Sequence, residues 1–156
     1  MSPGRDGNDI DKERMIKEIS RCLSGFEDLL LGYLYGSFLV RNDFHDIDIG
    51  ILLSGERKPY ELFKYSMTIA SDLERCITPR FDVDLRILNN APVEFQYEVV
   101  RRGRAVFARD EGLRIAFEAD LMARMNRRER DWQTIVGIDR AGEFVAFDPE
   151  AIMKDD

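Results

Sequence analysis

The hydrophobic positions along the chain follow two kinds of pattern. In some segments the hydrophobic residues recur every three or four positions, as Ile16, Ile19 and Leu23 do, which is typical of a helix with one buried face. In others a short hydrophobic run is bounded by glycine, asparagine or proline, which is typical of a buried strand. The helical pattern predicts helices over Asp9–Gly25, Pro59–Ile77, Val93–Arg102 and Glu111–Arg130. The strand pattern predicts strands over Leu30–Tyr35, Ile47–Leu53, Phe81–Leu88 and Ala105–Ala108.

Residues at the ends of these segments support the boundaries. We expect Asn8 or Asp9 to cap the first helix and Gly25 to end it. Pro59 suits the first turn of a helix, where a missing N–H group has no cost. Gly103 follows a helical pattern directly, so a left-handed cap is expected there.

The order of the elements indicates the fold class. Helix, strand, strand, helix, strand, helix, strand and helix in succession predict an α/β (α+β) fold, with a small mixed β-sheet flanked by helices. We expect residues 1–8 to be a flexible leader and residues 9–132 to form one domain. Residues 133–156 are expected to be a loosely ordered C-terminal extension, with only a weak strand pattern over Glu143–Phe147.

Composition and charge narrow the function classes. The 156 residues are 44% hydrophobic, enough for one domain with a core of its own. No apolar run approaches the length of a membrane span, and the polar N-terminus lacks the core of a signal peptide, so a cytoplasmic protein is expected. A net charge of −7 disfavours a general nucleic-acid binder, which normally needs a basic surface.

The cysteines and the histidine argue against other kinds of site. Cys22 and Cys76 fall inside helical patterns without metal-ligand spacing, so we expect buried small side chains rather than a disulfide. His45 is the only histidine, which excludes a histidine-rich zinc site.

Two aspartates one residue apart are the strongest sign of chemistry. Asp46 and Asp48 open a strand pattern and should point to one face of it, because alternate strand residues share a face. Adjacent carboxylates repel unless a cation lies between them, and carboxylate pairs suit Mg²⁺, which also takes oxygens from substrate phosphates. The turn at Gly36 and Ser37 can offer N–H groups and a hydroxyl to a polyphosphate. This pattern indicates nucleotidyl transfer with two metal ions.

A two-metal site also needs a third carboxylate from a neighbouring strand. Asp82 and Asp84 share a face of the third predicted strand. Asp84 lies well inside that strand, where a charge is costly unless it is paired or metal-bound. We therefore expect Asp84 to be the third ligand, with Asp82 as the fallback.

Simpler interpretations exist for each of these residues. Taken alone, the aspartate pair could be the solvated start of a strand, and a Gly-Ser pair is an ordinary turn. Arg86 shares the face of Asp84 and could contact phosphate or form a structural ion pair. His45 is expected to be a polar loop residue, although a nucleotide contact is conceivable. Tyr33 and Tyr35 are expected to pack within a strand.

The combined motif resembles a known superfamily. The run Tyr33-Leu-Tyr-Gly-Ser37, the pair Asp46-Ile-Asp48 and the later Asp84 are similar to the DNA polymerase β nucleotidyltransferase superfamily. More narrowly, the chain resembles the minimal nucleotidyltransferases, lone catalytic domains often paired with a helical HEPN-type partner as toxin–antitoxin systems. The resemblance covers roughly residues 10–110. The spacer of eight residues, 38–45, is shorter than is common there, and no glycine follows Arg41.

The resemblance implies a role for each matching residue. Gly36, Ser37 and Arg41 would bind the nucleotide, with the first two at the β- and γ-phosphates of ATP. Both Mg²⁺ ions would be bound by Asp46 and Asp48, and Asp84 would bind the ion beneath the acceptor hydroxyl. The implied activity is transfer of AMP from ATP to a protein hydroxyl, by an antitoxin that adenylylates its HEPN-type toxin partner.

Two alternatives to this activity remain open at the level of sequence. One is transfer of a nucleotide to a small hydroxylated molecule such as an aminoglycoside, which a large acidic cleft would favour. The other is a non-catalytic binding module that neutralises its partner by contact alone.

Overall fold

Nine helices and strands make up the part of the chain that the structure, a computed structural model, describes: residues 11–136, with side chains up to residue 128. In chain order they are α1 (Lys12–Ser24), β1 (Leu29–Tyr35), α2 (Ser37–Val40), β2 (Asp46–Leu53), α3 (Pro59–Cys76), β3 (Asp82–Ile87), α4 (Val93–Arg102), β4 (Arg104–Ala108) and α5 (Glu111–Val136).

The four strands form one mixed sheet in the order β3-β2-β1-β4. β1 pairs with β2 and with β4 in antiparallel fashion, whereas β2 and β3 are parallel and are joined by α3. The predicted fold class, a small mixed sheet flanked by helices, is therefore confirmed.

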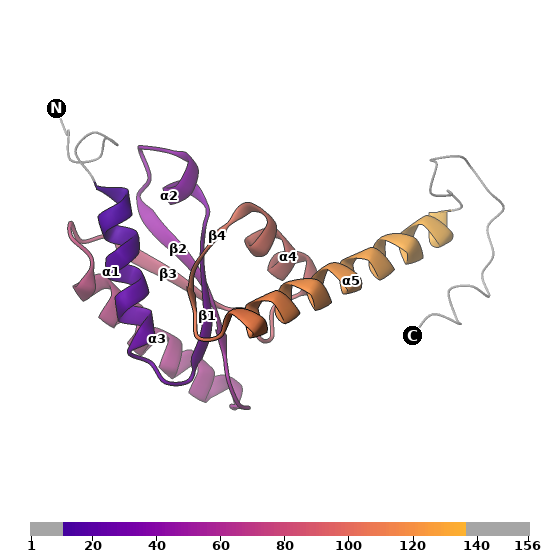
Figure 1. The fold of residues 1–156 in the computed structure, drawn as a ribbon, viewed down its shortest axis with the longest axis horizontal. Helices are drawn as coiled ribbons and strands as arrows, with labels where there is room; N and C mark the ends of the chain where they lie inside the picture. The colour runs from indigo at the N-terminus through magenta and orange to yellow at the C-terminus, as the bar shows by residue number, and fades with distance from the viewer. Residues whose placement is uncertain (1–10, 137–156) are drawn as a thin grey trace.

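The larger core lies under α1 and α3. These helices cover one face of the sheet, and α4 and α5 lie on the other side (Figure 1). Alternate residues of β2 point into this core, and Ile47, Ile49 and Ile51 are completely buried there. Ile19 of α1 and Leu73 of α3 are buried against them. Each such side chain contributes about 1.5–3 kcal/mol through burial, which fixes the face that β2 turns inward.

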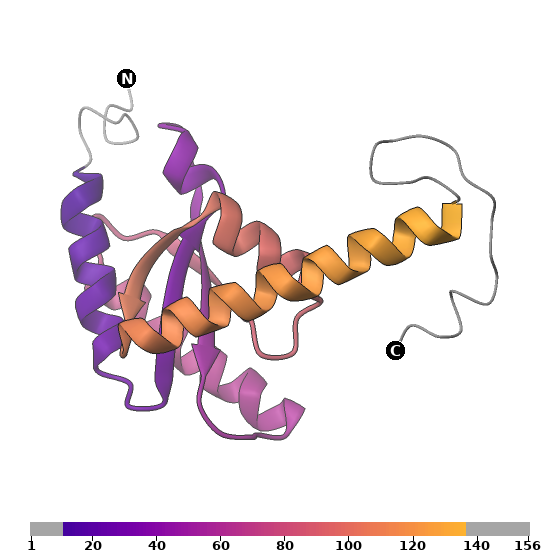
Figure 2. The same cartoon turned by 45° about the vertical axis from the view of Figure 1, so that its right-hand side comes forward.

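A smaller core lies on the opposite face, beneath α4 and α5. It contains Leu31, Tyr33, Leu88 and Val99. Gln96 is buried beside it, and its Nε2 donates a 2.7 Å hydrogen bond to the Leu88 carbonyl. α5 begins next to β4 and then extends away from the sheet (Figure 2). α4 packs against β1 and β4, and α5 packs against β4, so the two helices cover the β1–β4 side of this face.

Several boundaries differ from the sequence predictions. Asp11 is the N-cap of α1, since its Oδ1 accepts a 2.9 Å hydrogen bond from the Arg14 N–H. The helix therefore starts later than Asn8 or Asp9 would place it. Gly25 does end α1, as predicted. The four-residue helix α2 was not predicted, because no periodic pattern can be seen in so short a segment.

Gly103 is not the left-handed cap that its position suggested. Its φ is −89°, which any residue can adopt. Glycine is favoured there for a different reason: a Cβ atom would overlap the Val99 carbonyl oxygen and lie 2.5 Å from the Leu34 carbonyl oxygen. The residue thus allows the end of α4 to approach β1 closely.

α5 is longer than the predicted helix over Glu111–Arg130. It continues to Val136, and residues 113–136 contain neither glycine nor proline to interrupt it. The proposed leader, residues 1–8, and the weak strand pattern over Glu143–Phe147 lie outside the described residues. Of the helices within residues 11–136, none combines the length and the hydrophobicity that crossing a membrane requires.

The two cysteines are less buried than expected. Cys22 is half-buried, but Cys76 is exposed, because it is the last residue of α3. The two thiols hydrogen-bond to each other, and burial followed by this bond raises the pKa of Cys22 to about 12.

Candidate active site

β2 and β3 lie side by side in a register that brings four aspartates together. Asp46 pairs with Asp82, and Asp48 pairs with Asp84. Paired residues of parallel strands point to the same face, so all four carboxylates stand on one face of the sheet. The larger core lies on the opposite face, where Ile47 and Ile49 are buried. The structure therefore places the three predicted metal ligands, and the fallback Asp82, on two adjacent strands.

Asp48 lies in surroundings that disfavour its ionised form. Burial, then the negative charges of Asp46 and Asp84, then a hydrogen bond with Asp84 raise the pKa of the Asp48 carboxyl to about 6. Negative charge thus accumulates at this point of the sheet without enough positive charge to balance it. A divalent cation would relieve the repulsion and favour the ionised form of Asp48.

The predicted phosphate-binding turn lies directly against Asp48. Gly36 has a φ of +80°, a conformation that favours glycine. A Cβ atom at this position would overlap Asp48 Oδ2, so only glycine lets the backbone pass so close to the carboxylate. Ser37 follows as the first residue of α2. The turn and the aspartates are separated in sequence but lie together in one cluster.

Arg86 and Tyr35 complete the surroundings of the carboxylates. The Nε of Arg86 is 3.3 Å from Asp84 Oδ1, and the arginine side chain is 59% exposed. The structural ion pair that the sequence left open for Arg86 is thus present. Tyr35 lies opposite Asp48 in the register of β1 and β2, and its ring contacts Phe95 edge-on. Burial and the charges of Asp48 and Asp84 raise the pKa of the Tyr35 hydroxyl to about 12.

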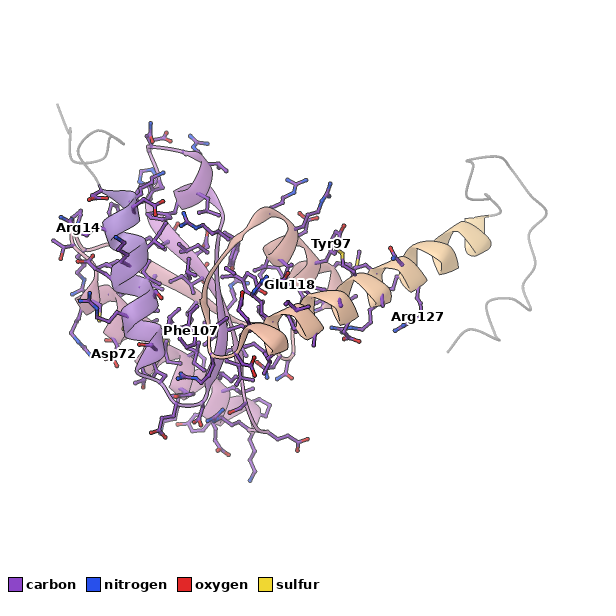
Figure 3. The ribbon with its side chains drawn as sticks, viewed as in Figure 1. Arg14, Asp72, Tyr97, Phe107, Glu118 and Arg127 are labelled. Carbon is purple, nitrogen blue, oxygen red and sulfur yellow. The ribbon has the colours of Figure 1, made fainter. Side chains whose placement is uncertain are left out.

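Tyr35 is a neighbour of the site that sequence reasoning assigned only to packing. The signal was available, because Tyr35 directly precedes Gly36 and β1 must pair with the strand that carries Asp48. Tyr33 does pack as expected: it is 1% exposed, and its hydroxyl donates a 2.6 Å hydrogen bond to Glu118 of α5. Glu118 is labelled in Figure 3, on the part of α5 nearest the sheet.

Arg41, the third predicted nucleotide-binding residue, is engaged elsewhere in this structure. Its guanidinium donates two 2.9 Å hydrogen bonds to the carboxylate of Asp43. This arginine lowers the pKa of Asp43 to about 2. Both side chains are exposed on the loop between α2 and β2, and His45 is exposed at the end of the same loop. A role of Arg41 or His45 toward the nucleotide remains a prediction.

The donor set is chemically suited to Mg²⁺, although the side chains are not already arranged around one point. Among residues 11–128 no three acidic, cysteine or histidine side chains converge as a ready-made set of metal ligands. Asp84 is instead held by Arg86 and by its hydrogen bond with Asp48. Oxygen-only ligands are the ones that Mg²⁺ takes, and small rotations of side chains on one sheet face can bring them together.

A protein-family comparison identifies a related domain. The family model described as "Polymerase beta, Nucleotidyltransferase" matches residues 17–112, which contain all the predicted site residues. A search of curated proteins found no match.

Several solved structures with a similar fold are toxin–antitoxin complexes. The tri-AMPylated HEPN toxin of Shewanella oneidensis in complex with MNT antitoxin gives a TM-score of 0.60 at 22% identity, over 81% of this chain and 96% of the other. The toxin–antitoxin MntA–HepT gives 0.58 at 22% identity, over 80% and 95%. The toxin–antitoxin with AMP-PNP gives 0.57 at 22% identity, over 81% and 96%. At these identities the likeness concerns the fold.

Proposed function

Because this chain belongs to the polymerase beta nucleotidyltransferase family, we propose that it transfers AMP from ATP to a hydroxyl group on a protein, with Mg²⁺ as cofactor. The observation that supports this most strongly is the pairing of Asp48 with Asp84 on one sheet face, directly beside the Gly36 turn. A nucleoside triphosphate needs both a cation site and a backbone turn to bind its phosphates. Here the candidate cation site and the candidate turn are in contact.

Different site residues would bind the phosphates of the nucleotide and the metal ions. Gly36 and Ser37 would hold the β- and γ-phosphates, and Arg41 would assist if it leaves Asp43. Asp46 and Asp48 would hold two Mg²⁺ ions, and Asp84 would hold the ion on the acceptor side. Bound there, the ions would lower the pKa of the acceptor hydroxyl and stabilise the attacking and leaving oxygens.

The proposed reaction is a substitution at the α-phosphorus. The acceptor oxygen forms a bond to that phosphorus, the bond to the bridging oxygen of the β-phosphate breaks, and pyrophosphate leaves. In this proposal Asp84 takes up the proton of the acceptor hydroxyl, and its half-exposed carboxylate supports the role because an acceptor could reach it from solvent. Tyr35 lies opposite Asp48 and its ring contacts Phe95 edge-on, so an aromatic pair would stand near the bound acceptor.

We propose that the acceptor is a HEPN-type helical protein and that this chain is its antitoxin. The support is the likeness to the MNT antitoxin seen with a tri-AMPylated HEPN toxin, which extends over 96% of that antitoxin's chain. A cytoplasmic location forms part of this proposal, because both ATP and such a partner would be met there.

The test is transfer of radioactive label from ATP labelled at the α-phosphate. The pure protein is incubated with this ATP and Mg²⁺, with and without the protein encoded by the neighbouring gene. Label on that partner is the expected result. Label only on a small hydroxylated acceptor such as an aminoglycoside would favour the second candidate, which the four acidic residues on one face make reasonable. Absence of label in all mixtures would favour a binding module.

A double variant and a matched control make this test specific. Asp46→Asn with Asp48→Asn should abolish transfer while the protein stays folded, because each change keeps the side-chain size and removes a charge. Glu61→Gln alters an exposed acid on α3 and should transfer as well as the wild type. If the double variant still transfers AMP, the assignment of the site is wrong.

A further inference from the structure

One lysine of α1 reaches the loop that carries the phosphate-binding turn. Lys12 is the first residue of α1, and its Nζ donates 2.6 Å hydrogen bonds to the carbonyl oxygens of Phe38 and Arg41. The same Nζ lies 5.2 Å from the centre of the Phe38 ring and 5.1 Å from that of Phe44. Burial lowers the pKa of Lys12. Four contacts thus converge on one ammonium group from residues 26 or more positions away in sequence.

One of these carbonyls belongs to Phe38 within α2, which spans Ser37–Val40, and the other to Arg41, the C-cap residue of that helix. The backbone bonds at the ends of α2 run from the Leu39 N–H to the Gly36 carbonyl and from the Arg41 N–H to the Ser37 carbonyl, so they use other acceptors than the two that Lys12 contacts. The carbonyls in the last turn of a helix have no N–H group of that helix to accept from. A lysine ammonium meets this need well, since it offers three donors and a positive charge at the helix C-terminus.

The turn at the other end of α2 is the one against Asp48. Gly36 and Ser37 precede or begin α2, and the Lys12 ammonium holds its C-terminal end. Phe38 is buried and its ring contacts Phe44 at a centroid distance of 4.9 Å. The buried rings of Phe38 and Phe44 therefore attach this loop to the core, and the Lys12 ammonium hydrogen-bonds to its backbone.

We propose that Lys12 is a positioning residue that fixes residues 36–41 in the conformation in which Gly36 and Ser37 stand beside Asp48. This inference rests on the proposed function in one respect, namely that these two residues hold the nucleotide phosphates. Lys12 acts through the loop backbone rather than on the substrate. Its loss should therefore weaken nucleotide binding and raise the KM for ATP, with kcat largely retained.

The test compares Lys12→Met with Lys12→Arg and with Lys17→Met, an exposed lysine on the same helix. Hydrogen exchange of the Leu39 and Arg41 amides is measured without nucleotide, and binding of AMP-PNP with Mg²⁺ is measured by calorimetry. Lys12→Met should exchange faster at both amides and bind about tenfold more weakly, equivalent to about 1.4 kcal/mol. Lys12→Arg should recover both properties, because arginine keeps the charge and the donors. Lys17→Met should match the wild type.

The outcomes separate this inference from the proposed function. Wild-type protein that binds no nucleotide would overturn the proposed function, and the exchange data alone would then decide whether Lys12 fixes the loop. Unchanged exchange and affinity in Lys12→Met would overturn the inference while the proposed function stands. If Lys12→Met does not fold, Lys12→Gln is used, which keeps two amide donors without the charge. Lys12→Gln should also exchange faster and bind AMP-PNP more weakly, because it lacks the charge, and wild-type exchange and affinity in this variant would overturn the proposal.

Discussion

The backbone of Gly36 lies so close to the carboxylate of Asp48 that a side chain on the glycine would overlap Asp48 Oδ2. The turn proposed to hold phosphate and the carboxylate proposed to hold metal are therefore in direct contact across the β1–β2 pair. Neither can move without displacing the other, and this coupling leads to the first prediction.

Gly36→Ala should abolish AMP transfer with only a modest loss of stability. The added methyl group would displace the turn or Asp48, and a misplacement of about 1 Å at such a site can cost about 100-fold in rate. Gly55→Ala is the matched control, because Gly55 also has a positive φ, +77°, but a Cβ atom there meets nothing within 4 Å. Gly55→Ala should lose about 1 kcal/mol of unfolding free energy through backbone strain, and Gly36→Ala about 2 kcal/mol, because a φ of +80° with a ψ of −158° is a conformation that only glycine adopts readily. Equal transfer by the two variants would contradict the prediction.

Asp48→Asn should make the metal-free protein more stable at pH 8 than the wild type. The folded protein keeps the proton on Asp48 up to about pH 6, whereas the unfolded chain releases it near pH 4, so the stability contributed by this group is present below about pH 4 and lost as the pH rises through 6. Asparagine avoids that loss. Thermal melts in EDTA should show a gain on the order of 1 kcal/mol at pH 8 and a smaller gain at pH 5.

The control for this pH effect is Asp43→Asn, for which the opposite sign is expected. Arg41 lowers the pKa of Asp43 to about 2, so the folded state favours the ionised form, and replacing it should not stabilise the protein at pH 8. A gain for Asp48→Asn of the same size at both pH values would show that repulsion at the carboxylates is not its cause.

Asp84→Asn and Asp82→Asn should differ sharply in activity. Asp84 is paired with Asp48 and hydrogen-bonded to it, whereas Asp82 is exposed at the start of β3 and pairs with Asp46. Label transfer from ATP should fall at least about 100-fold in Asp84→Asn, as for the loss of other transition-state charge contacts. In Asp82→Asn it should fall less than about tenfold. The reverse order would make Asp82 the third metal ligand.

Tyr33→Phe should lower stability without affecting transfer. The Tyr33 hydroxyl joins β1 to Glu118 of α5 rather than to any of the four aspartates, and Glu118 is also paired with Arg114 at 3.0 Å. Removing the hydroxyl should cost about 1 kcal/mol of unfolding free energy, measured by denaturant titration. Tyr60→Phe, at a tyrosine that is 69% exposed, serves as the control and should cost close to nothing. A loss of transfer in Tyr33→Phe would indicate that α5 influences the site.

Much of the fold followed from the sequence because its signals are local. The alternation of Asp46 and Asp48 with Ile47 and Ile49 determined which face of β2 is buried, since side chains two residues apart share a face. Helical spacing likewise identified α4 at its observed bounds, Val93–Arg102. The short helix α2 could not be predicted in this way, because four residues are too few to show a period.

The sequence by itself determined which residues carry the carboxylates, the glycine turn and the buried faces, because these depend on residue type and on a period of a few positions. Only the tertiary structure decided that Asp84 stands opposite Asp48, that Arg86 pairs with Asp84, and that the turn abuts Asp48. It also decided that Lys12 holds the end of α2. Strand register and long-range side-chain contacts arise from the packing of whole elements against each other, and no local pattern contains that information.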